Sequence, residues 1–474
     1  MKRNETGDAH PGGADQNRDV SYFDLAIVGG GFSGICTAWH LLSHERVRPT
    51  FRCAIIEPAA QLGAGLAYRT DCPCHLLNVR ARGMSISSRD SRSFVRWLSE
   101  VSPEYSPDDF IPRGIYRRYL TTCLDRALES FQSGALAVLR DEVLAVVPPS
   151  GFDEYLLRLK SGNIIRARSV VLALGNLPSK SQLDNGLLCP PWSHSLDYRS
   201  IRTLAIIGTG LTALDVILEA EEAGYSGRYV LISRHGQFPR PHNDPPLAVP
   251  DELRQWAADL VASRPRLRHV LRAFQQKRKS GFHWQPLVDA LRRVAPDIWR
   301  GFVPQDKKKF LCRLRALWNT HLHRSCQRSI QTVMQLRDSG RLEQIYSRVV
   351  AVEKRDGRSD SAVRLVLQPG KVATVDVDAA VNGMGLFSNI LQTDSQLVAQ
   401  LLEDGLVQPD AFRLGLRANS LGQLISANGT FQPLLFTVGT LRRGEELECT
   451  AVPEIRRQVA GMVEEIIRVL GEIS

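Results

Sequence analysis

The sequence predicts an α/β fold that contains two Rossmann-like dinucleotide-binding domains and a helical insert. Two observations support the paired domains. A strand–glycine–helix pattern occurs twice, about 180 residues apart, and a β-prone run ending in glycine follows each copy. The insert is indicated by a basic segment with helical spacing inside the second copy. With 474 residues, the chain is long enough for two or three domains with substantial cores.

The first copy of the pattern is FDLAIVGGGFSGI, at residues 23–35. Its glycines form a G-x-G-x-x-G fingerprint, which allows a tight turn, a close approach of a pyrophosphate to the backbone, and close packing of the helix on the strand. A second β-prone run, FRCAIIEP, ends in a carboxylate that can accept hydrogen bonds from ribose hydroxyls. The residues expected to bind this dinucleotide are Gly29, Gly31, Phe32, Ser33, Gly34 and Glu57.

The second copy contains LAIIGTGLTALDV, at residues 204–216, with alanine in the third, packing position of the fingerprint. The strand that follows, RYVLIS, ends in Ser233-Arg234 rather than in an acid. An acid would repel a 2′-phosphate, whereas Ser and Arg can bind one, so we expect NADPH here. The alternative is that Arg234 is a solvated loop residue. The residues expected at this site are Gly208, Gly210, Leu211, Thr212, Ala213, Ser233 and Arg234.

Two dinucleotide folds in one chain indicate a flavoprotein, with FAD in the N-terminal fold and NADPH in the internal fold. The β-prone runs 169–179 and 378–388 each follow a segment with the pattern of a β-meander, at 154–169 and 362–378. The expected division of the chain is a disordered lead (1–20), the FAD domain (21–200 and 386–474), the NADPH domain (201–245 and 344–385) and the helical insert (246–343).

The insert has a strong basic excess. Between Asp251 and Glu343, 20 Lys or Arg stand against 8 Asp or Glu, and the whole chain has a net charge of +10. Three interpretations stay open: solvated helix faces, a site for an anionic cofactor or substrate, and nucleic-acid binding, for which the sequence has no accompanying motif. We expect the insert to cap the cleft between the dinucleotide domains and to recognise a substrate. His321 and His323 do not share a helix face, so no metal site is expected there.

Nine cysteines are scattered along the chain without a C-x-x-C pair, and most are expected to be reduced thiols. The one close pair, Cys72-Pro73-Cys74, leaves open a redox pair. No apolar run reaches the roughly 18 to 20 residues of a membrane span, and the first 20 residues lack the apolar core of a signal peptide. We therefore expect a cytosolic protein with no membrane partner.

The chain resembles the two-dinucleotide-binding flavoproteins, which include flavin-dependent monooxygenases, and more closely a bacterial family described as FAD/NAD(P)-binding proteins. The resemblance covers nearly everything after residue 20. It departs from the family pattern at VNGMG (381–385), at Cys449 and at WNTHLHR (318–324). The segments that carry it are GAGLAY (63–68), HLLNVRARGMS (75–85), DDFIPRGIYRRYL (108–120), IIGTGLTALDV (206–216), SRHGQFPRPH (233–242) and GTLRRGEELECTAVPEIRRQ (439–458).

The resemblance implies roles for several residues. Asn78 would lie beside the flavin ring, and the backbone at Gly439 would approach the ribityl-phosphate region of FAD. Pro453 would stand in the first turn of a helix whose N-terminus points at the flavin pyrimidine. His194 precedes the second fingerprint and is either a catalytic or a linker residue.

The resulting hypothesis is a monooxygenase in which NADPH reduces FAD and a flavin C4a-hydroperoxide oxygenates a small metabolite, with O₂ as co-substrate. N-hydroxylation of an amine is the preferred subtype, and the basic insert favours an anionic substrate. Two alternatives stay open: a flavin oxidase or dehydrogenase that passes electrons on without oxygen transfer, and a low-turnover NADPH- or redox-responsive binding protein. No nucleic-acid partner is expected, and the sequence leaves the oligomeric state open.

Overall fold

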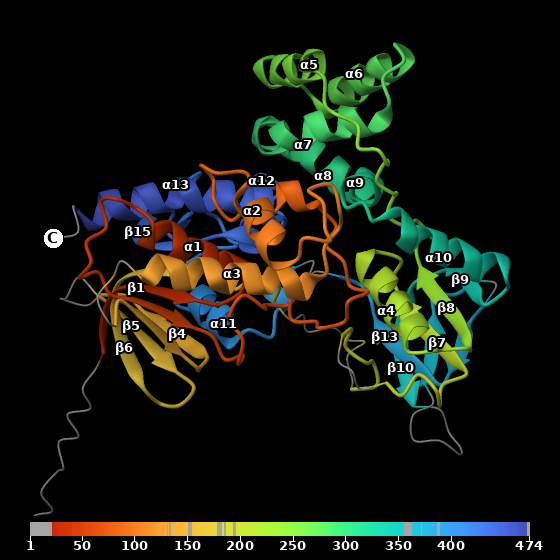
Figure 1. The fold of residues 1–474 in the computed structure, drawn as a ribbon, viewed down its shortest axis with the longest axis horizontal. Coiled ribbons are helices and arrows are strands. Elements are labelled where there is room, and N and C mark those ends of the chain that lie inside the picture. Colours follow the sequence, from red (N-terminus) through yellow and green to blue (C-terminus); the bar gives the residue numbers. More distant parts are fainter. Residues whose placement is uncertain are drawn as a thin grey trace, which may run out of the picture.

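The computed structural model describes residues 21–129, 131, 134–149, 154–177, 183, 186–192, 196–354, 363–370, 372–385 and 389–471. Two units, each built on a parallel sheet, stand side by side beneath a helical cap (Figure 1). The predicted α/β class with two Rossmann-like units and an inserted helical part is confirmed.

The first unit is a largely parallel sheet with helices on one face and a β-meander on the other. Its strands are β1 (Tyr22–Val28), β2 (Cys53–Ile56), β3 (Leu136–Leu139), β4 (Val143–Val147), β5 (Tyr155–Leu159), β6 (Ile164–Leu172), β14 (Gln423–Ile425) and β15 (Phe431–Thr437). The order is β14-β15-β6-β1-β2-β3, and the antiparallel pairs β4–β5 and β5–β6 confirm the expected meander. Leu25 and Ile27 of β1 face the helical core, whereas Ala26 and Val28 face the other core.

Helices of the first unit come from both ends of the chain. They are α1 (Phe32–Leu42), α2 (Ser93–Val101), α3 (Arg113–Leu128), α11 (Gln396–Glu403), α12 (Arg443–Glu446) and α13 (Val452–Leu470). Helices α1, α3 and α13 bury their apolar faces in one core above the sheet, and α11 packs with the meander below it (Figure 1). The C-terminal helix is therefore part of the same core as the first strand.

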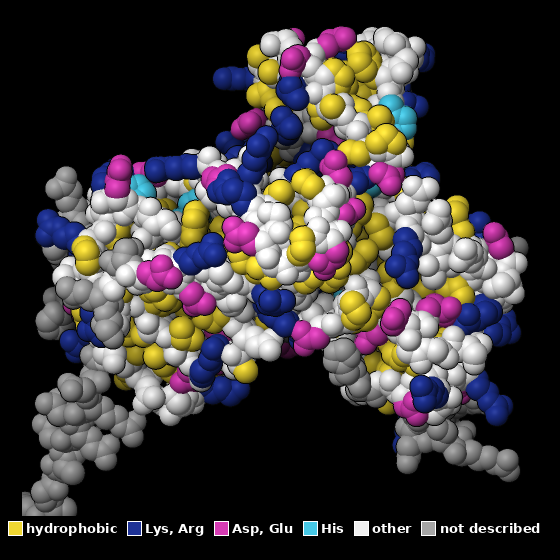
Figure 2. All heavy atoms as spheres, viewed as in Figure 1, with side chains coloured by type: hydrophobic (Ala, Val, Ile, Leu, Met, Phe, Trp, Pro, Cys, Tyr) yellow, Lys and Arg dark blue, Asp and Glu magenta, His cyan; other side chains and the backbone are white. Residues whose placement is uncertain are grey.

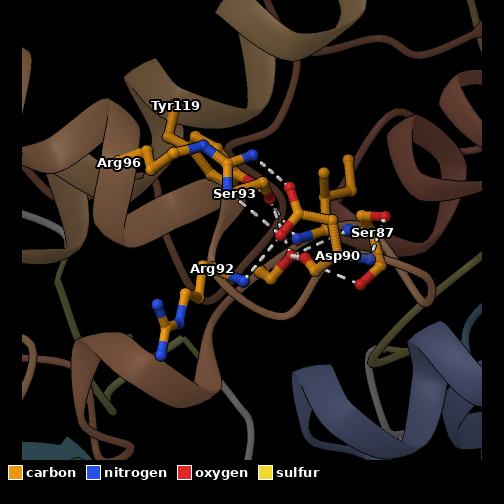
Figure 3. A network of polar contacts seen from close by, with 8 residues as sticks. Ser87, Asp90, Arg92, Ser93, Arg96 and Tyr119 are labelled. Carbon is orange, nitrogen blue, oxygen red and sulfur yellow. Dashed lines mark hydrogen bonds and ion pairs between the residues drawn. The ribbon is translucent and has the colours of Figure 1, made fainter.

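A polar network fixes the loop between the segment 75–85 and α2 (Figure 3). The Ser85 hydroxyl lies 2.7 Å from Ser93 Oγ, which contacts the Tyr119 hydroxyl of α3. The Asp90 backbone N–H donates to Ser87 Oγ at 2.9 Å, and Arg96 pairs with the Asp90 carboxylate. This network joins the end of the 75–85 segment to α2 and α3.

The second unit repeats the arrangement on a smaller scale. Its parallel sheet, in the order β13-β7-β8-β9, has α4 (Leu211–Glu222) and α10 (Gln327–Asp338) on one face and a second meander on the other. Leu204 and Ile206 face the helices, and Ala205 and Ile207 face the meander. The strands are β7 (Thr203–Ile207), β8 (Arg228–Ser233), β9 (Leu342–Tyr346), β10 (Val349–Lys354), β11 (Val363–Leu367), β12 (Thr374–Val377) and β13 (Ala379–Asn382).

The cap consists of the helices between β8 and α10. They are α5 (Asp251–Ala262), α6 (Leu267–Lys279), α7 (Trp284–Gly301), α8 (Pro304–Lys309), a π-helical turn (Phe310–Leu314) and α9 (Arg315–Leu322). Helix α10 was expected to belong to the insert, but it buries Val333 and Leu336 against α4 in the core of the second unit. Its apolar face thus has a partner in the second unit, and the structure separates α10 from the cap.

The cap is attached to the first unit, although it is inserted in the second. Trp299 of α7 is 1% exposed, and its indole N–H donates to the Gly444 carbonyl at 2.8 Å. Its ring centroid lies 6.2 Å from that of Phe412, and Leu447 packs on the same apolar cluster. Residues of the first unit therefore complete the core of the cap.

Charged side chains are distributed over the whole visible face. Lys and Arg are spread over the cap and both units in Figure 2, interspersed with Asp and Glu, rather than gathered in one stripe. Among the residues that the structure describes, no helix combines the length and the apolar character needed to cross a membrane.

Candidate functional site

The two fingerprints form the same tight turn. Gly29 has φ +108° and Gly208 has φ +120°, values that favour glycine. A side chain at Gly29 would collide with the Ala173 carbonyl at the end of β6, and one at Gly208 with the Gly383 carbonyl at the end of β13. The first glycine of each fingerprint is thus needed because a neighbouring strand end lies against it.

The third fingerprint position sets how closely the helix approaches the turn. A Cβ atom at Gly34, the third residue of α1, would collide with the Gly29 carbonyl, so only glycine fits at this position. In the second unit, Ala213 occupies the equivalent place and is fully buried. Both residues lie where the helix meets the turn, the position at which the fingerprint requires a small residue.

The N-terminus of α1 can receive an anionic group. Gly31 is its N-cap, no side chain caps the helix, and the first turn has no acid. A Cβ atom at Gly31 would face only the Gly65 backbone, at 3.4 Å. The ring of Phe32 is buried in the core, with its centroid 6.3 Å from that of Tyr116. Only the backbone of Phe32 can therefore contact a bound anion. The free N–H groups and the helix dipole suit a pyrophosphate.

Glu57 lies directly beside this turn, after β2. Its Oε2 accepts a hydrogen bond from the Gly30 N–H at 2.7 Å, and its Oε1 accepts one from the Ala59 N–H at 2.9 Å. The loop GAGLAY covers the same turn, since the Gly63 N–H donates to the Gly30 carbonyl at 2.8 Å. The backbone therefore holds the carboxylate at the place where a dinucleotide ribose would lie.

The C-terminal segment returns to the same helix start. Gly439 has φ +76°, and a Cβ atom there would lie 3.2 Å from Ser33 Oγ. The Gly439 N–H donates to Gln458 Oε1 of α13 at 2.8 Å. Helix α13 begins at Val452 with Pro453 in its first turn, as the sequence indicates. Segments from both ends of the chain thus meet at the start of α1.

The second fingerprint also presents an open helix start. Nothing lies within 4 Å of a Cβ atom built at Gly210, the N-cap of α4, whose first turn has no acid. Leu211 and Thr212 begin this helix. The neighbouring Thr209 hydroxyl donates to the Gln237 carbonyl at 2.8 Å and so holds the loop after β8 against the fingerprint.

That loop carries the residues expected to bind a 2′-phosphate. Ser233 Oγ accepts from the Gly236 N–H at 2.9 Å, so its hydroxyl already shapes the turn, while Arg234 is exposed. Farther along, the Arg240 N–H donates to the Thr320 carbonyl of α9 at 2.8 Å. Burial lowers the pKa of Arg315 in α9; Glu448 opposes this effect, and Arg234 adds to it. The cap therefore brings a second guanidinium toward Arg234.

Asn78 lines a hollow where the two units meet. The hollow is also lined by Leu76, Arg113 at the start of α3, and Leu211 of α4. The Asn78 carbonyl lies 3.0 Å from His242 Nε2, and Arg113 pairs with Asp215 of α4 at 2.8 Å. Asn78 thus lies where the first unit meets the start of α4, whereas His194 lies outside the described residues.

Buried charges fill the contact between the cap and α13. The Arg292 guanidinium of α7 donates two hydrogen bonds to the Glu454 carboxylate, at 2.8 and 3.0 Å. The Trp318 indole N–H donates to Glu448 Oε1 at 2.7 Å. Burial raises the pKa of Glu448 to about 7, against the hydrogen bond from Trp318 and the charge of Arg292. Burial likewise lowers the pKa of His323 to about 4, with Arg292 adding to the effect.

Comparison with known proteins agrees with the geometry of the first unit. Residues 26–177 match the family model described as FAD-NAD(P)-binding. This part of the chain is an FAD/NAD(P)-binding domain. The matched residues contain the first fingerprint, Glu57 and Asn78. A search of the curated proteins finds no match.

Solved structures resemble the chain beyond the FAD/NAD(P)-binding domain. An ornithine N-hydroxylase from Kutzneria sp. 744, solved with reduced FAD, NADP⁺ and L-ornithine, has a TM-score of 0.66 at 16% identity, over 95% of this chain and 100% of that one. The FAD-bound cadaverine monooxygenase of Erwinia amylovora has a TM-score of 0.62 at 13% identity, and the match covers 94% of each chain. The L-lysine 6-monooxygenase of Pseudomonas syringae has a TM-score of 0.61 at 15% identity, and the match covers 95% of this chain and 100% of that one. These likenesses establish a shared fold.

Several residues of the junction were not singled out from the sequence. Arg113, Asp215, Arg292, Arg315 and Glu448 come from five separate helices or loops. The motifs DDFIPRGIYRRYL, IIGTGLTALDV and GTLRRGEELECTAVPEIRRQ contain Arg113, Asp215 and Glu448, so the resemblance marked these segments but not the contacts that their side chains make. Only the packing of the cap on the first unit brings Arg292 and Glu448 together.

The Gly31→Leu variant should lose bound FAD, because its side chain would occupy the helix start opposite Gly65. The ratio of flavin to protein absorbance in the purified protein measures this. The matched control is Gly301→Leu, at the end of α7, where a Cβ atom meets nothing within 4 Å and FAD should stay bound. Stoichiometric FAD in the Gly31 variant would refute the site.

Glu448→Gln should stabilise the protein at high pH. A carboxyl whose pKa rises from 4.5 unfolded to about 7 folded binds its proton more tightly in the folded state. As the pH rises from 4.5 through 7, the free energy of unfolding of the wild type should therefore decrease relative to that of the variant. The decrease should reach up to about 3 kcal/mol at pH 8. Urea unfolding at pH 5 to 8 measures it. Exposed Glu403→Gln is the control and should show no such trend.

Proposed function

We propose that the protein is an FAD- and NADPH-dependent monooxygenase that hydroxylates the nitrogen of a small amine. The observation that carries this proposal is the combination of two dinucleotide-binding units with a cap that contacts the first unit. This fold is shared along nearly the full chain with an ornithine N-hydroxylase, a cadaverine monooxygenase and an L-lysine 6-monooxygenase. The overall reaction would be R–NH₂ + O₂ + NADPH + H⁺ → R–NHOH + H₂O + NADP⁺. FAD would supply the hydride acceptor and the activation of O₂.

The residues of this chain would bind and orient the two cofactors. The α1 N-terminus and the Gly439 backbone suit the FAD phosphates, and Glu57 suits a ribose. The open start of α4 suits the NADPH pyrophosphate, with Arg234 as the 2′-phosphate ligand. The start of α4, at Leu211, lines the same hollow as Asn78 of the first unit, so hydride transfer would occur at this junction.

The substrate would enter beneath the cap. Arg292, Trp318 and Glu448 exclude water from the contact between the cap and the start of α13, on the side where the flavin pyrimidine would lie. The Arg315 guanidinium, whose charge interacts with those of Glu448 and Arg234, would give an anionic group of the substrate a place to bind. A cytosolic location suits both NADPH and small amine metabolites.

The function can be tested by mixing the NADPH-reduced protein rapidly with oxygenated buffer. A transient absorbance at about 370–390 nm, characteristic of an oxygen adduct of reduced flavin, is expected. Its decay should then be coupled to hydroxylamine formation from ornithine, lysine or cadaverine as trial amines. Reoxidation without a transient would contradict the proposal and favour an oxidase or an electron-transfer protein. Absence of any reduction by NADPH would favour a binding protein.

Arg234→Ala should raise the KM for NADPH by about 10- to 100-fold, because a charge-assisted hydrogen bond to the 2′-phosphate is lost. The KM for NADH should change less than about threefold, since NADH has no such group. Steady-state NADPH oxidation measures both values. Arg240→Ala, also exposed in the same loop, is the control. Equal effects on the two cofactors would remove the assignment.

A further inference from the structure

Cys72 and Cys74 form a disulfide on an accessible loop of the first unit. Their sulfurs are bonded, with the Cα atoms 5.4 Å apart, and both side chains are partly exposed on either side of exposed Pro73. The other seven cysteines are free. The sequence left a redox pair open at this place, and a soluble thiol can reach both sulfurs.

The disulfide loop is joined to a fully buried histidine through hydrogen bonds. The Cys72 N–H donates to the Thr70 hydroxyl oxygen at 3.2 Å, and that hydroxyl lies 2.7 Å from His75 Nδ1. The backbone N–H of His75 donates to the Cys72 carbonyl at 3.1 Å. Burial lowers the pKa of His75, and the Asp215 and Glu219 carboxylates oppose this effect. Thr70 and His75 therefore hold the backbone on either side of the pair.

The same histidine contacts the second unit. Its Nε2 lies 3.1 Å from the Asp215 carbonyl of α4, so this nitrogen carries the proton, and Nδ1 accepts from Thr70. Beside it, Arg113 pairs with the Asp215 carboxylate at 2.8 Å. One continuous chain of hydrogen bonds thus runs from the cysteine loop to the helix that begins at the second fingerprint.

We propose that Cys72 and Cys74 are a reversible thiol–disulfide site that controls how the loop 70–78 docks on α4. An external dithiol would attack one sulfur, release the other as a thiolate, and leave as a cyclic disulfide, so that two electrons and two protons convert the bridge into two thiols. A disulfide oxidant would reverse the step. In the disulfide form the loop holds His75 on α4; in the dithiol form the loop loses this covalent constraint.

A metal site is the other chemistry that these residues could support. The Cys72 and Cys74 sulfurs and a His75 nitrogen lie within 4.8 Å of one another. Both ring nitrogens, however, are engaged with Thr70 and Asp215, and a structural zinc site takes four ligands. The geometry therefore favours thiol–disulfide chemistry, and metal binding is an outcome of the test.

The direct test counts thiols in the full-length protein. After denaturation, seven alkylated cysteines are expected in the oxidised protein and nine after prior treatment with dithiothreitol under native conditions. Peptide mapping should place the difference at Cys72 and Cys74. Nine free thiols after incubation with oxidised dithiothreitol would overturn the proposal. So would a bridge that only denaturant makes reducible, or stoichiometric zinc retained by the reduced protein.

A second measurement tests the link to α4. Deuterium exchange of residues 70–78 and of α4 should rise in the dithiol form, and the rate of flavin reduction by NADPH should fall about three- to tenfold, the size of losing one hydrogen bond. Cys72→Ser with Cys74→Ser should resemble the reduced protein in both redox states. Exposed Cys312→Ser is the control and should keep the redox dependence. Identical exchange in both states would overturn the docking role, even if the flavin is active.

Discussion

Both sheets are organised by the close approach of a fingerprint glycine to the end of a neighbouring strand. At Gly29 and at Gly208 a positive φ angle turns the chain from strand into helix, and the carbonyl of Ala173 or Gly383 fills the space that a side chain would take. This contact places the start of α1 or α4 at the carboxyl edge of its sheet. Glu57 accepts a hydrogen bond from Gly30 in the first turn, and Thr209 of the second turn holds the loop that carries Arg234.

The shared geometry explains why so much of the fold could be predicted from the sequence. Fingerprint glycines, strand periodicity and meanders are local patterns, and both copies lie where the spacing indicated. The boundary of the insert could not be predicted in the same way. Helix α10 has the same amphipathic pattern as the helices of the cap, and only its packing on α4, through Val333 and Leu336, shows which core it joins.

Side-chain roles at the sites depend on tertiary contacts to different degrees. Positions fixed by the turn, such as Gly31 and Gly34, follow from spacing alone. Phe32 stands in the same motif, yet its ring belongs to the core beside Tyr116. The charged pair Arg292–Glu454 joins residues 162 positions apart, and Trp318–Glu448 joins residues 130 apart. No local pattern could pair them, because the cap and the segment 448–454 are distant in the sequence and meet only through tertiary packing.

The attachment of the cap has a consequence for exchanging parts between related proteins. Helices α5–α9 are inserted within the second unit, but their apolar core is completed by Phe412 and Leu447, and Arg292 and Trp318 donate hydrogen bonds to Glu454 and Glu448. A chimaera that received a foreign cap alone would lose Arg292 and Trp318, and would leave Glu454 and Glu448 without these donors. A functional graft would have to carry the stretch from Phe412 to Glu454 as well, so the natural module for recombination is discontinuous in the gene.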